Sequence, residues 1–291
     1  MYNLLIALGI GALAFAAGSL ATNTIIAGVI PAMLASGIGY FLLMRRTGKQ
    51  LAVITQEAMD IFQNKMPSAR TPEAQQALFA EGRTALERGF SLQRWQFLIG
   101  SQLHAQLGSL SYMQMDFTTA HSHLLKADTW LGRYTAWQPL SMLALIELRN
   151  GDKDAAVKRL SGLTTAGSKD ALFWALYAVS AHRAGQTEVA LKAISEGLEK
   201  VPSSKELKTL ADQIRNKRRL TPEIFGQGWL QFFPDQAQQI LSANPALRQQ
   251  MMAAQAANGS MDPGQMNRAQ RRAAKRGKQP QQAPPLKHPR F

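Results

Sequence analysis

The chain has 291 residues and a formal net charge of +14, and 46% of its residues are hydrophobic. It contains no cysteine, which excludes disulfide scaffolds, thiolate zinc sites and cysteine nucleophiles and fits a reducing compartment. The excess of lysine and arginine indicates a polyanionic partner, such as nucleic acid, acidic lipid or an acidic protein.

The first 44 residues carry no charged side chain and contain two apolar runs, Asn3–Leu20 and Thr24–Met44. Each run is about long enough to cross a bilayer, and only Ala21 to Asn23 separate them. A cleaved signal peptide is the alternative for the first run, but no Lys or Arg precedes it and a second apolar run follows at once. The sequence therefore predicts a transmembrane helical hairpin over residues 1–46.

Small residues recur at helical spacing in both runs: Ala7, Gly11, Ala14 and Gly18 in the first, and Gly28, Ala32, Ala35 and Gly39 in the second. Lipid gives helices no hydrophobic reason to associate, so close backbone approach at small residues is what lets them pack. The two stripes predict an antiparallel pair packed face to face, or an oligomer formed through one stripe.

Basic residues Arg45, Arg46 and Lys49 directly follow the second run, whereas the turn between the runs is uncharged. The positive-inside rule places the basic end on the cytoplasmic side. Two spans return the N-terminus to the same side, so we expect an integral plasma or inner membrane protein with most of its chain in the cytoplasm. Residues 47–70 are predicted to form a juxtamembrane helix and linker that continues the second span.

Farther along, a hinge residue followed five positions later by alanine recurs with a period of 34 to 36 residues: Met115 and Ala120, Gly151 and Ala156, Gly185 and Ala190. A helix is predicted on either side of each hinge. Glycine reaches the hinge conformation without strain, and alanine lets the second helix cross the first closely. A single hairpin of this kind cannot bury its apolar stripe alone, so we expect the hairpins to stack.

These residues resemble the tetratricopeptide repeat family over about Ser101 to Val201. The third unit matches best, with Trp174 at the aromatic position, Ala178 at the small position and Pro202 at the end. The second unit lacks the aromatic residue and the final proline, and the first has Met115 in place of the hinge glycine. The resemblance implies an all-α fold, with a short α-solenoid over residues 71–220; an unrelated helical bundle is the alternative.

In the tetratricopeptide family the first helix of each unit lines a concave groove that receives a peptide or a partner helix. The resemblance assigns this partner groove to Gln102, Ser109, Tyr112, Gln138, Ser141, Arg149, His182 and Arg183. Arg149 and Arg183 occupy equivalent positions and favour an acidic partner. The Lys and Asn clamp of chaperone-binding members is replaced by residues such as Leu145 and Val179, which argues against chaperone tails as ligands.

Residues 221–258 contain aromatic residues and methionines, and Phe225, Trp229, Phe232 and Phe233 follow the spacing of one helical face. We expect this segment to dock on the end of the array. Two alternatives stay open: the segment fills the groove, or it presents its aromatic face to a partner.

Residues 259–291 form a basic tail that is predicted to be disordered. Its polyanion-binding residues are predicted to be Arg268, Arg271, Arg272, Lys275, Arg276 and Lys278. Repulsion between like charges at helical spacing disfavours a helix in isolation, so we expect the tail to fold only against a polyanion such as RNA, the ribosome or acidic lipid. A solvated tail that aids solubility is the alternative.

The sequence offers no constellation for catalysis, no phosphate-cradling glycine loop and no metal-ligand spacing. His121 and His123 lie two residues apart and point away from each other on a helix, and His104 and His182 are isolated. We therefore expect no enzyme activity, no metal and no cofactor. The sequence predicts a membrane-anchored scaffold that recruits a protein partner at the cytoplasmic face. The alternative is a membrane-tethered polyanion binder that acts through its tail.

Overall fold

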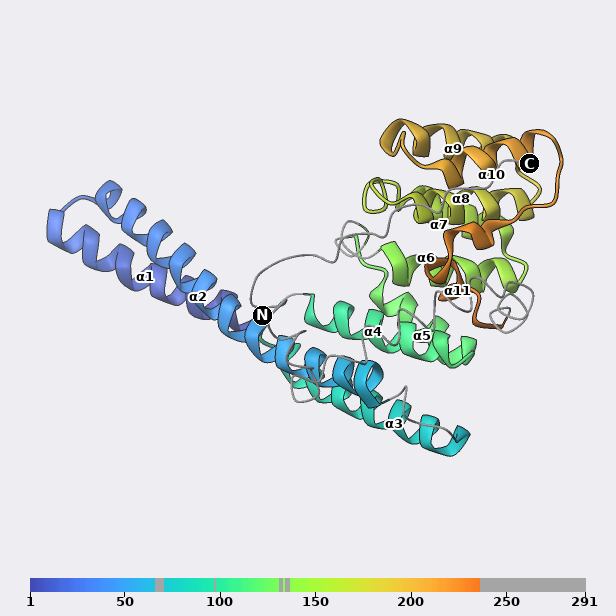
Figure 1. The fold of residues 1–291 in the computed structure, drawn as a ribbon. Coiled ribbons are helices and arrows are strands. Elements are labelled where there is room, and N and C mark those ends of the chain that lie inside the picture. The colour runs from blue at the N-terminus through green and yellow to red at the C-terminus, as the bar shows by residue number, and fades with distance from the viewer. Residues whose placement is uncertain (66–70, 97, 131–132, 134–136, 236–291) are drawn as a thin grey trace, which may run out of the picture. The chain divides into compact units, whose positions relative to one another are not determined.

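The computed structural model describes residues 1–65, 71–96, 98–130, 133 and 137–235 (Figure 1). This part of the chain is helical and contains no β-strand, so the predicted all-α class is confirmed for it. Residues 236–258 of the aromatic segment and the whole basic tail, with its six predicted polyanion-binding residues, lie outside the described residues.

Two apolar helices, α1 (Tyr2–Thr22) and α2 (Ile25–Asp60), form an antiparallel pair at the N-terminus (Figure 1). Each is long enough and apolar enough to cross a membrane. Asn23 ends α1 in the left-handed conformation, with φ of 54°. α2 does not stop after the apolar run but continues unbroken to Asp60, and a π-helical turn, η1 (Ile61–Lys65), follows.

The two predicted small-residue stripes face each other across this pair. A methyl group on Gly11 would lie 3.0 Å from the carbonyl oxygen of Ala32, and one on Gly18 would lie 3.1 Å from the Cα atom of Gly28. The backbones therefore approach so closely that a larger side chain at either glycine would push them apart. This confirms face-to-face packing within one chain.

Helix α3 (Pro72–Arg88) connects the apolar pair to the rest of the protein. Thr71 caps it by accepting a hydrogen bond of 3.2 Å from the amide of Ala74. α3 packs against α2 and α4 (Ile99–Met113), and a short 3-10 turn, η3 (Gly89–Leu92), follows it. A small apolar core joins these three helices; it contains Leu51, Ala58, Ala85, Leu86, Ile99, Leu103 and Leu107.

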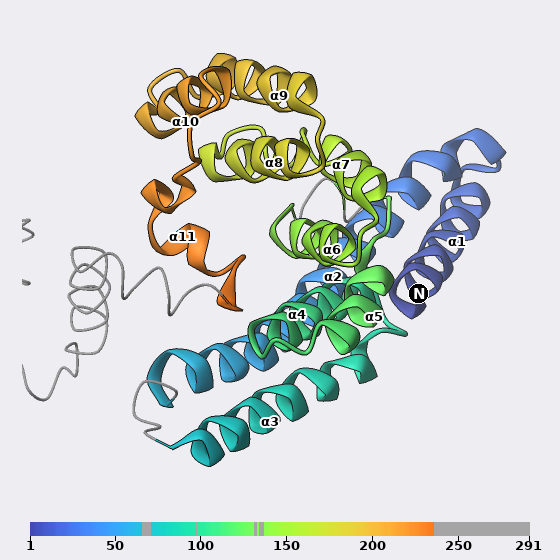
Figure 2. The same ribbon diagram turned by 90° about the vertical axis from the view of Figure 1, so that its right-hand side faces the viewer.

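Three helical hairpins follow in chain order (Figure 1). They are α4 with α5 (Phe117–Ala127), α6 (Trp137–Arg149) with α7 (Lys153–Ser161), and α8 (Ala171–Arg183) with α9 (Thr187–Lys200). Each hairpin packs on the next, and α10 (Lys205–Arg215) packs on α8 and α9 (Figure 2). A larger apolar core runs through all of them.

The three hairpin turns share one backbone geometry. Their hinge residues adopt positive φ angles, 62° at Met115, 95° at Gly151 and 86° at Gly185. The next residue donates its amide to a carbonyl five positions back in every case: Asp116 to Ser111, Asp152 to Glu147, and Gln186 to Ala181, at 2.9 to 3.0 Å. These contacts form the Schellman motif, which ends a helix and reverses the chain.

The predicted crossing alanines are equally regular. Ala120, Ala156 and Ala190 are completely buried where the second helix of each hairpin meets the first. Because interiors are closely packed, these small buried side chains allow the paired helices to approach each other closely.

After α10 the chain turns back in two short pieces, η5 (Pro222–Phe225) and α11 (Gln227–Leu230). Gly226, with φ of 65°, separates them, so the aromatic residues do not lie on one continuous helix as their spacing predicted.

Candidate functional site

The first helices of the three hairpins, α4, α6 and α8, all contact the chain that follows α10. We call residues 222–235 the C-terminal segment. The hydroxyl of Tyr112 on α4 donates a hydrogen bond of 2.7 Å to the carbonyl oxygen of Phe232. The ring of Trp137 on α6 stacks on that of Phe232, with 5.9 Å between centroids. A methyl group on Gly228 would lie 2.9 Å from the side chain of Leu172 on α8.

The aromatic residues of the C-terminal segment are part of the core. Trp229 is 1% exposed and Phe232 is 0% exposed, and Trp229 stacks on Phe233 with 4.7 Å between centroids. Burial of an aromatic side chain contributes roughly 1.5–3 kcal/mol, so this docking is strong. Residues 222–235 therefore lie along the first helices of all three hairpins, and not on the end of the array alone, as we expected from the sequence.

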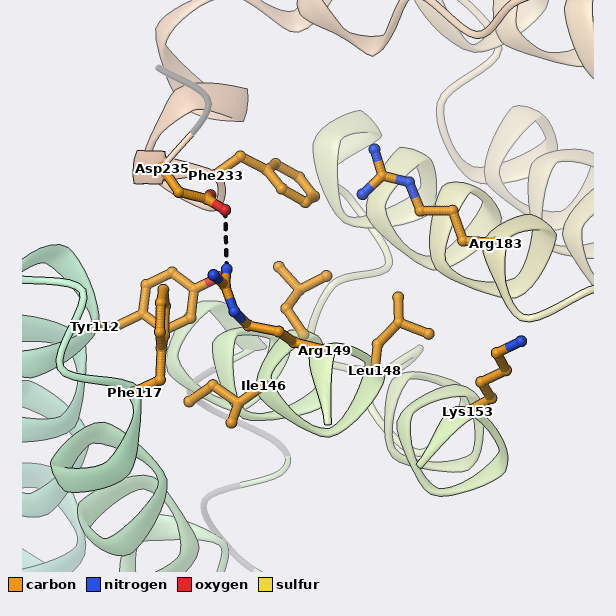
Figure 3. Close-up of a pocket in the computed structure, with 10 residues that line it drawn as sticks. Tyr112, Phe117, Ile146, Leu148, Arg149, Lys153, Arg183, Phe233 and Asp235 are labelled. Carbon is orange, nitrogen blue, oxygen red and sulfur yellow. Dashed lines mark hydrogen bonds and ion pairs between the residues drawn. The ribbon is translucent and has the colours of Figure 1, made fainter. Parts of the chain in front are cut away.

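A pocket of about 290 Å³ remains beside the C-terminal segment, between α4, α6 and α8 (Figure 3). The Arg149 guanidinium donates to the Asp235 carboxylate at 2.9 Å and lies 4.3 Å from the centroid of the Phe117 ring. The Arg183 guanidinium lies 5.1 Å from the centroid of the Phe233 ring. In the pocket, two guanidinium groups thus contact two side chains of the C-terminal segment, the carboxylate of Asp235 and the ring of Phe233.

These polar contacts are weaker than the apolar docking beneath them. The Arg149 side chain is 52% exposed and that of Asp235 is 32% exposed. An ion pair in such contact with water contributes about 0–1 kcal/mol. The Arg149–Asp235 pair therefore adds little to the stability of the docked segment.

The structure brings together three of the eight predicted groove residues. Tyr112, Arg149 and Arg183 line the pocket. Gln102 instead lines a separate pocket beside α2, and Gln138 is exposed.

Within the described part of the chain, no hydrogen bond, ion pair or ring contact joins the other three predicted groove residues to the C-terminal segment. Ser109 donates its hydroxyl to the Ala105 carbonyl of its own helix at 2.9 Å. Ser141 is completely buried, and neither its hydroxyl nor the Nδ1 atom of His182 has a hydrogen-bond partner among the described residues.

Two side-chain clusters were not foreseen from the sequence. His104 on α4, which seemed isolated in the sequence, faces His123 on α5 with 3.0 Å between their Nδ1 atoms. Arg159 on α7 binds both Glu147 and Asp128, and all three side chains are largely buried. The paired residues in these two clusters are 12 to 31 positions apart in the sequence, so no local spacing pattern indicates that they meet.

Nothing in the described part of the chain resembles a metal centre, because no group of three or more His, Asp or Glu side chains is arranged to hold an ion there. Comparisons with family models, with curated proteins and with solved structures find no match to this chain.

Proposed function

We propose that this protein is a membrane-anchored scaffold of the tetratricopeptide type that recruits a protein partner at the cytoplasmic face of the membrane. The shared turn geometry at Met115, Gly151 and Gly185 supports this repeat type. So do the buried crossing alanines, since both features recur at the period of the family.

The apolar helices α1 and α2 supply the anchor in this proposal. Arg45, Arg46 and Lys49 follow the apolar part of α2, and the positive-inside rule assigns their end of the pair to the cytoplasm. Helices α3 to α10 then lie on the same side of the membrane as these basic residues.

The observation that carries the recruiting role is the docking of the C-terminal segment along α4, α6 and α8. This is the face on which the family receives its ligands. Two residues of this segment, Phe233 and Asp235, each contact an arginine. We propose that the partner presents the same chemistry, an aromatic side chain next to a carboxylate, and displaces Phe233 and Asp235 from the two arginines.

A labelled peptide with the sequence of residues 227–235 tests this recognition against the full chain in detergent micelles. Asp235→Asn should strengthen peptide binding, because it weakens the internal competitor. Arg149→Glu should weaken binding, because it repels the peptide carboxylate. Lys192→Glu, a charge reversal at a position 78% exposed on α9, should bind as the unchanged protein does. Peptide binding that is insensitive to Arg149→Glu would refute the proposed groove.

The basic tail supports a second function, binding of a polyanion such as RNA or acidic lipid. Residues 261–291 carry eight Lys or Arg against one acid, and membrane anchoring would hold them near acidic headgroups. Deletion of residues 261–291 separates the two functions. Peptide binding by the groove should survive it, whereas binding of RNA or anionic vesicles through the tail should be lost and should weaken steeply with salt.

A further inference from the structure

The start of α1 is fastened to the loop that precedes α4. The amide of Tyr2 donates to the Arg94 carbonyl at 2.9 Å, and the amide of Asn3 donates to the Trp95 carbonyl at 3.2 Å. The terminal ammonium group of Met1 also donates to Arg94. The first amides of a helix have no partner within it, so these carbonyls cap α1. Trp95 is thereby held at the level of the first turn of α1.

The rings of Tyr2 and Trp95 meet edge to face, with 5.5 Å between centroids. If α1 crosses a bilayer from its first turn, both rings lie at the boundary between hydrocarbon and water. Tyrosine and tryptophan are enriched at this depth because one part of each ring system is apolar and another forms hydrogen bonds.

The α4–α5 hairpin brings a second exposed tryptophan to the same end of the fold. The Ser101 hydroxyl, in the first turn of α4, donates to the Ala127 carbonyl at 2.9 Å and lies 3.4 Å from the Thr129 hydroxyl. The end of α5 is therefore beside the start of α4. Trp130 follows Thr129, and Leu98 precedes α4, so both are near this end.

These residues are more exposed than apolar side chains of their size usually are. Trp130 is 73% exposed, Trp95 is 42% exposed and Leu98 is 38% exposed. The other three tryptophans of the chain, Trp137, Trp174 and Trp229, are at most 7% exposed. Exposed apolar residues gathered in one place mark a surface that is covered in the working protein.

Basic residues lie near the first turn of α1 and Trp95. The Asn3 amide group donates to the Thr47 hydroxyl at 2.9 Å, which aligns the first turn of α1 with the part of α2 that carries Arg45, Arg46 and Lys49. Arg94 is next to Trp95 in the loop, and residues 88–115 contain no acidic side chain. Each basic residue near an anionic membrane surface contributes about 1 kcal/mol of attraction.

We propose that Trp95, Leu98 and Trp130 form a membrane-contact surface that seats the helical domain on the headgroup region of an anionic bilayer. This inference rests on the proposed insertion of α1 and α2. The surface gives the domain a second attachment besides α2. It fixes the tilt of the hairpins on the membrane and so determines which way the groove of α4, α6 and α8 faces.

Tryptophan fluorescence of the full chain in vesicles tests the proposal. The vesicles contain phosphatidylcholine, a quarter phosphatidylglycerol and a lipid with a nitroxide quencher near the glycerol level. Two of the five tryptophans should be quenched, whereas the three buried ones provide an internal reference. Trp130→Phe should remove about half of the quenched signal, and the double variant with Trp95→Phe should remove all of it. Vesicles without phosphatidylglycerol should reduce the quenching.

Flotation of the same vesicles separates failure of the surface from failure of the anchor. Protein that floats with the vesicles and resists alkaline extraction, but shows no lipid quenching, would overturn the surface and leave the anchor in place. Protein that does not float would overturn both.

Discussion

The Tyr112 hydroxyl in α4 donates a hydrogen bond of 2.7 Å to the carbonyl oxygen of Phe232, a residue 120 positions later in the chain. Burial raises the pKa of Tyr112, the Asp235 carboxylate raises it further and the Arg149 guanidinium partly opposes them. The phenol therefore stays protonated at neutral pH. It serves as a permanent donor that fixes the register of the C-terminal segment on α4.

Replacing Tyr112 with phenylalanine tests this contact. Tyr112→Phe leaves a buried carbonyl without its partner, which should lower the free energy of unfolding by about 1–3 kcal/mol. Urea unfolding in detergent measures this loss, and hydrogen exchange should quicken at residues 226–233. Ser109→Ala is the matched control, because its hydroxyl bonds only to the Ala105 carbonyl of its own helix. Equal effects from the two substitutions would contradict the assigned role of Tyr112.

Met115 is the only one of the three hinge residues that is not glycine, yet its φ is 62°. A residue with a side chain is strained in this conformation by roughly 1–2 kcal/mol. Met115→Gly should therefore stabilise the protein by about 0.5–1 kcal/mol, after the added freedom of the unfolded chain is subtracted. Gln114→Gly, at a neighbouring position with φ of −77°, should destabilise it instead. Thermal unfolding of both variants gives the comparison, and a destabilised Met115→Gly protein would show that the turn is not strained.

The hinge positions illustrate what the sequence could predict. Glycine, methionine and alanine at a fixed period marked the turns and the helix crossings, because steric demands repeat wherever the same hairpin repeats. The small-residue stripes of α1 and α2 could also be predicted, since helical spacing alone defines a face. Both patterns are local, so each can be recognised without knowledge of the distant parts of the chain.

The path of the C-terminal segment was not predictable in the same way. The aromatic residues of that segment obey helical spacing, yet Gly226 breaks the helix and the segment contacts α4, α6 and α8. Only the shape of the face formed by three separate hairpins determines that outcome. For the same reason three predicted groove residues meet at the pocket and Gln102 lies elsewhere, beside α2. Repeat phase assigns a residue to a helix face but does not reveal which neighbour covers it.

The close approach of α1 and α2 gives a prediction for the apolar pair. A side chain on Gly28 would come within 2.6 Å of the Phe15 carbonyl oxygen, whereas one on Gly37 of the same helix meets nothing within 4 Å. Gly28→Leu should therefore separate the helices, and Gly37→Leu should leave them paired.

Because the chain has no cysteine, an engineered pair reports this directly. A Cβ atom on Gly39 would lie 3.9 Å from the Cα atom of Ala7, so Ala7→Cys with Gly39→Cys should form a disulfide on mild oxidation. Adding Gly28→Leu should suppress this cross-link, whereas adding Gly37→Leu should not. Cross-linking that survives Gly28→Leu would refute the proposed tight packing.

The buried ionic cluster predicts a large cost for the loss of one cation. Arg159 donates to Glu147 at 2.6 and 2.9 Å and also to Asp128, and the two carboxylates are only 10% and 8% exposed. Arg159→Met leaves two buried carboxylates facing each other, which should cost about 3–5 kcal/mol of unfolding free energy. Arg133→Met is the control, because Arg133 binds the same Asp128 but is 53% exposed, and it should cost about 1 kcal/mol or less.

Acid titration gives this cluster a second test. Burial tends to raise the pKa of Asp128, but hydrogen bonds from Arg133 and the charge of Arg159 outweigh it and hold the pKa below its usual value. A carboxyl whose pKa is lowered by folding stabilises the fold at pH values above its ordinary pKa. This contribution is lost as the pH falls through the pKa that the carboxyl has in the folded protein. The unchanged protein should therefore lose stability below about pH 4. In Arg159→Met, acidification from neutral pH should instead recover part of the loss, and urea midpoints measure both trends.

The His104 and His123 pair predicts that the stability of the fold also depends on pH in a range above that of the Asp128 carboxyl. Burial is the main cause that lowers the pKa of both imidazoles. His123 and Lys126 lower the pKa of His104 further. Lys126 and Arg83 lower the pKa of His123 further, whereas Glu87 raises it. With 3.0 Å between the two Nδ1 atoms, one neutral ring must accept the proton that the other donates. The unfolded chain takes up protons as the pH falls through about 6.5, while the folded pair resists them, so stability should decrease from pH 7.5 to 5.5.

Urea midpoints across this range provide the measurement. His123→Gln should flatten the pH dependence, because one of the two resisting groups is removed and the other loses its cationic neighbour. His121→Gln changes a histidine on the same helix that lies outside the pair, and it should keep the original slope. The contact of His104 with Phe90, at 4.8 Å between ring centroids, ties the pair to the η3 turn, so the loss of stability in acid should be accompanied by faster hydrogen exchange at residues 89–92. Identical slopes in the two variants would show that the paired imidazoles do not govern the acid response.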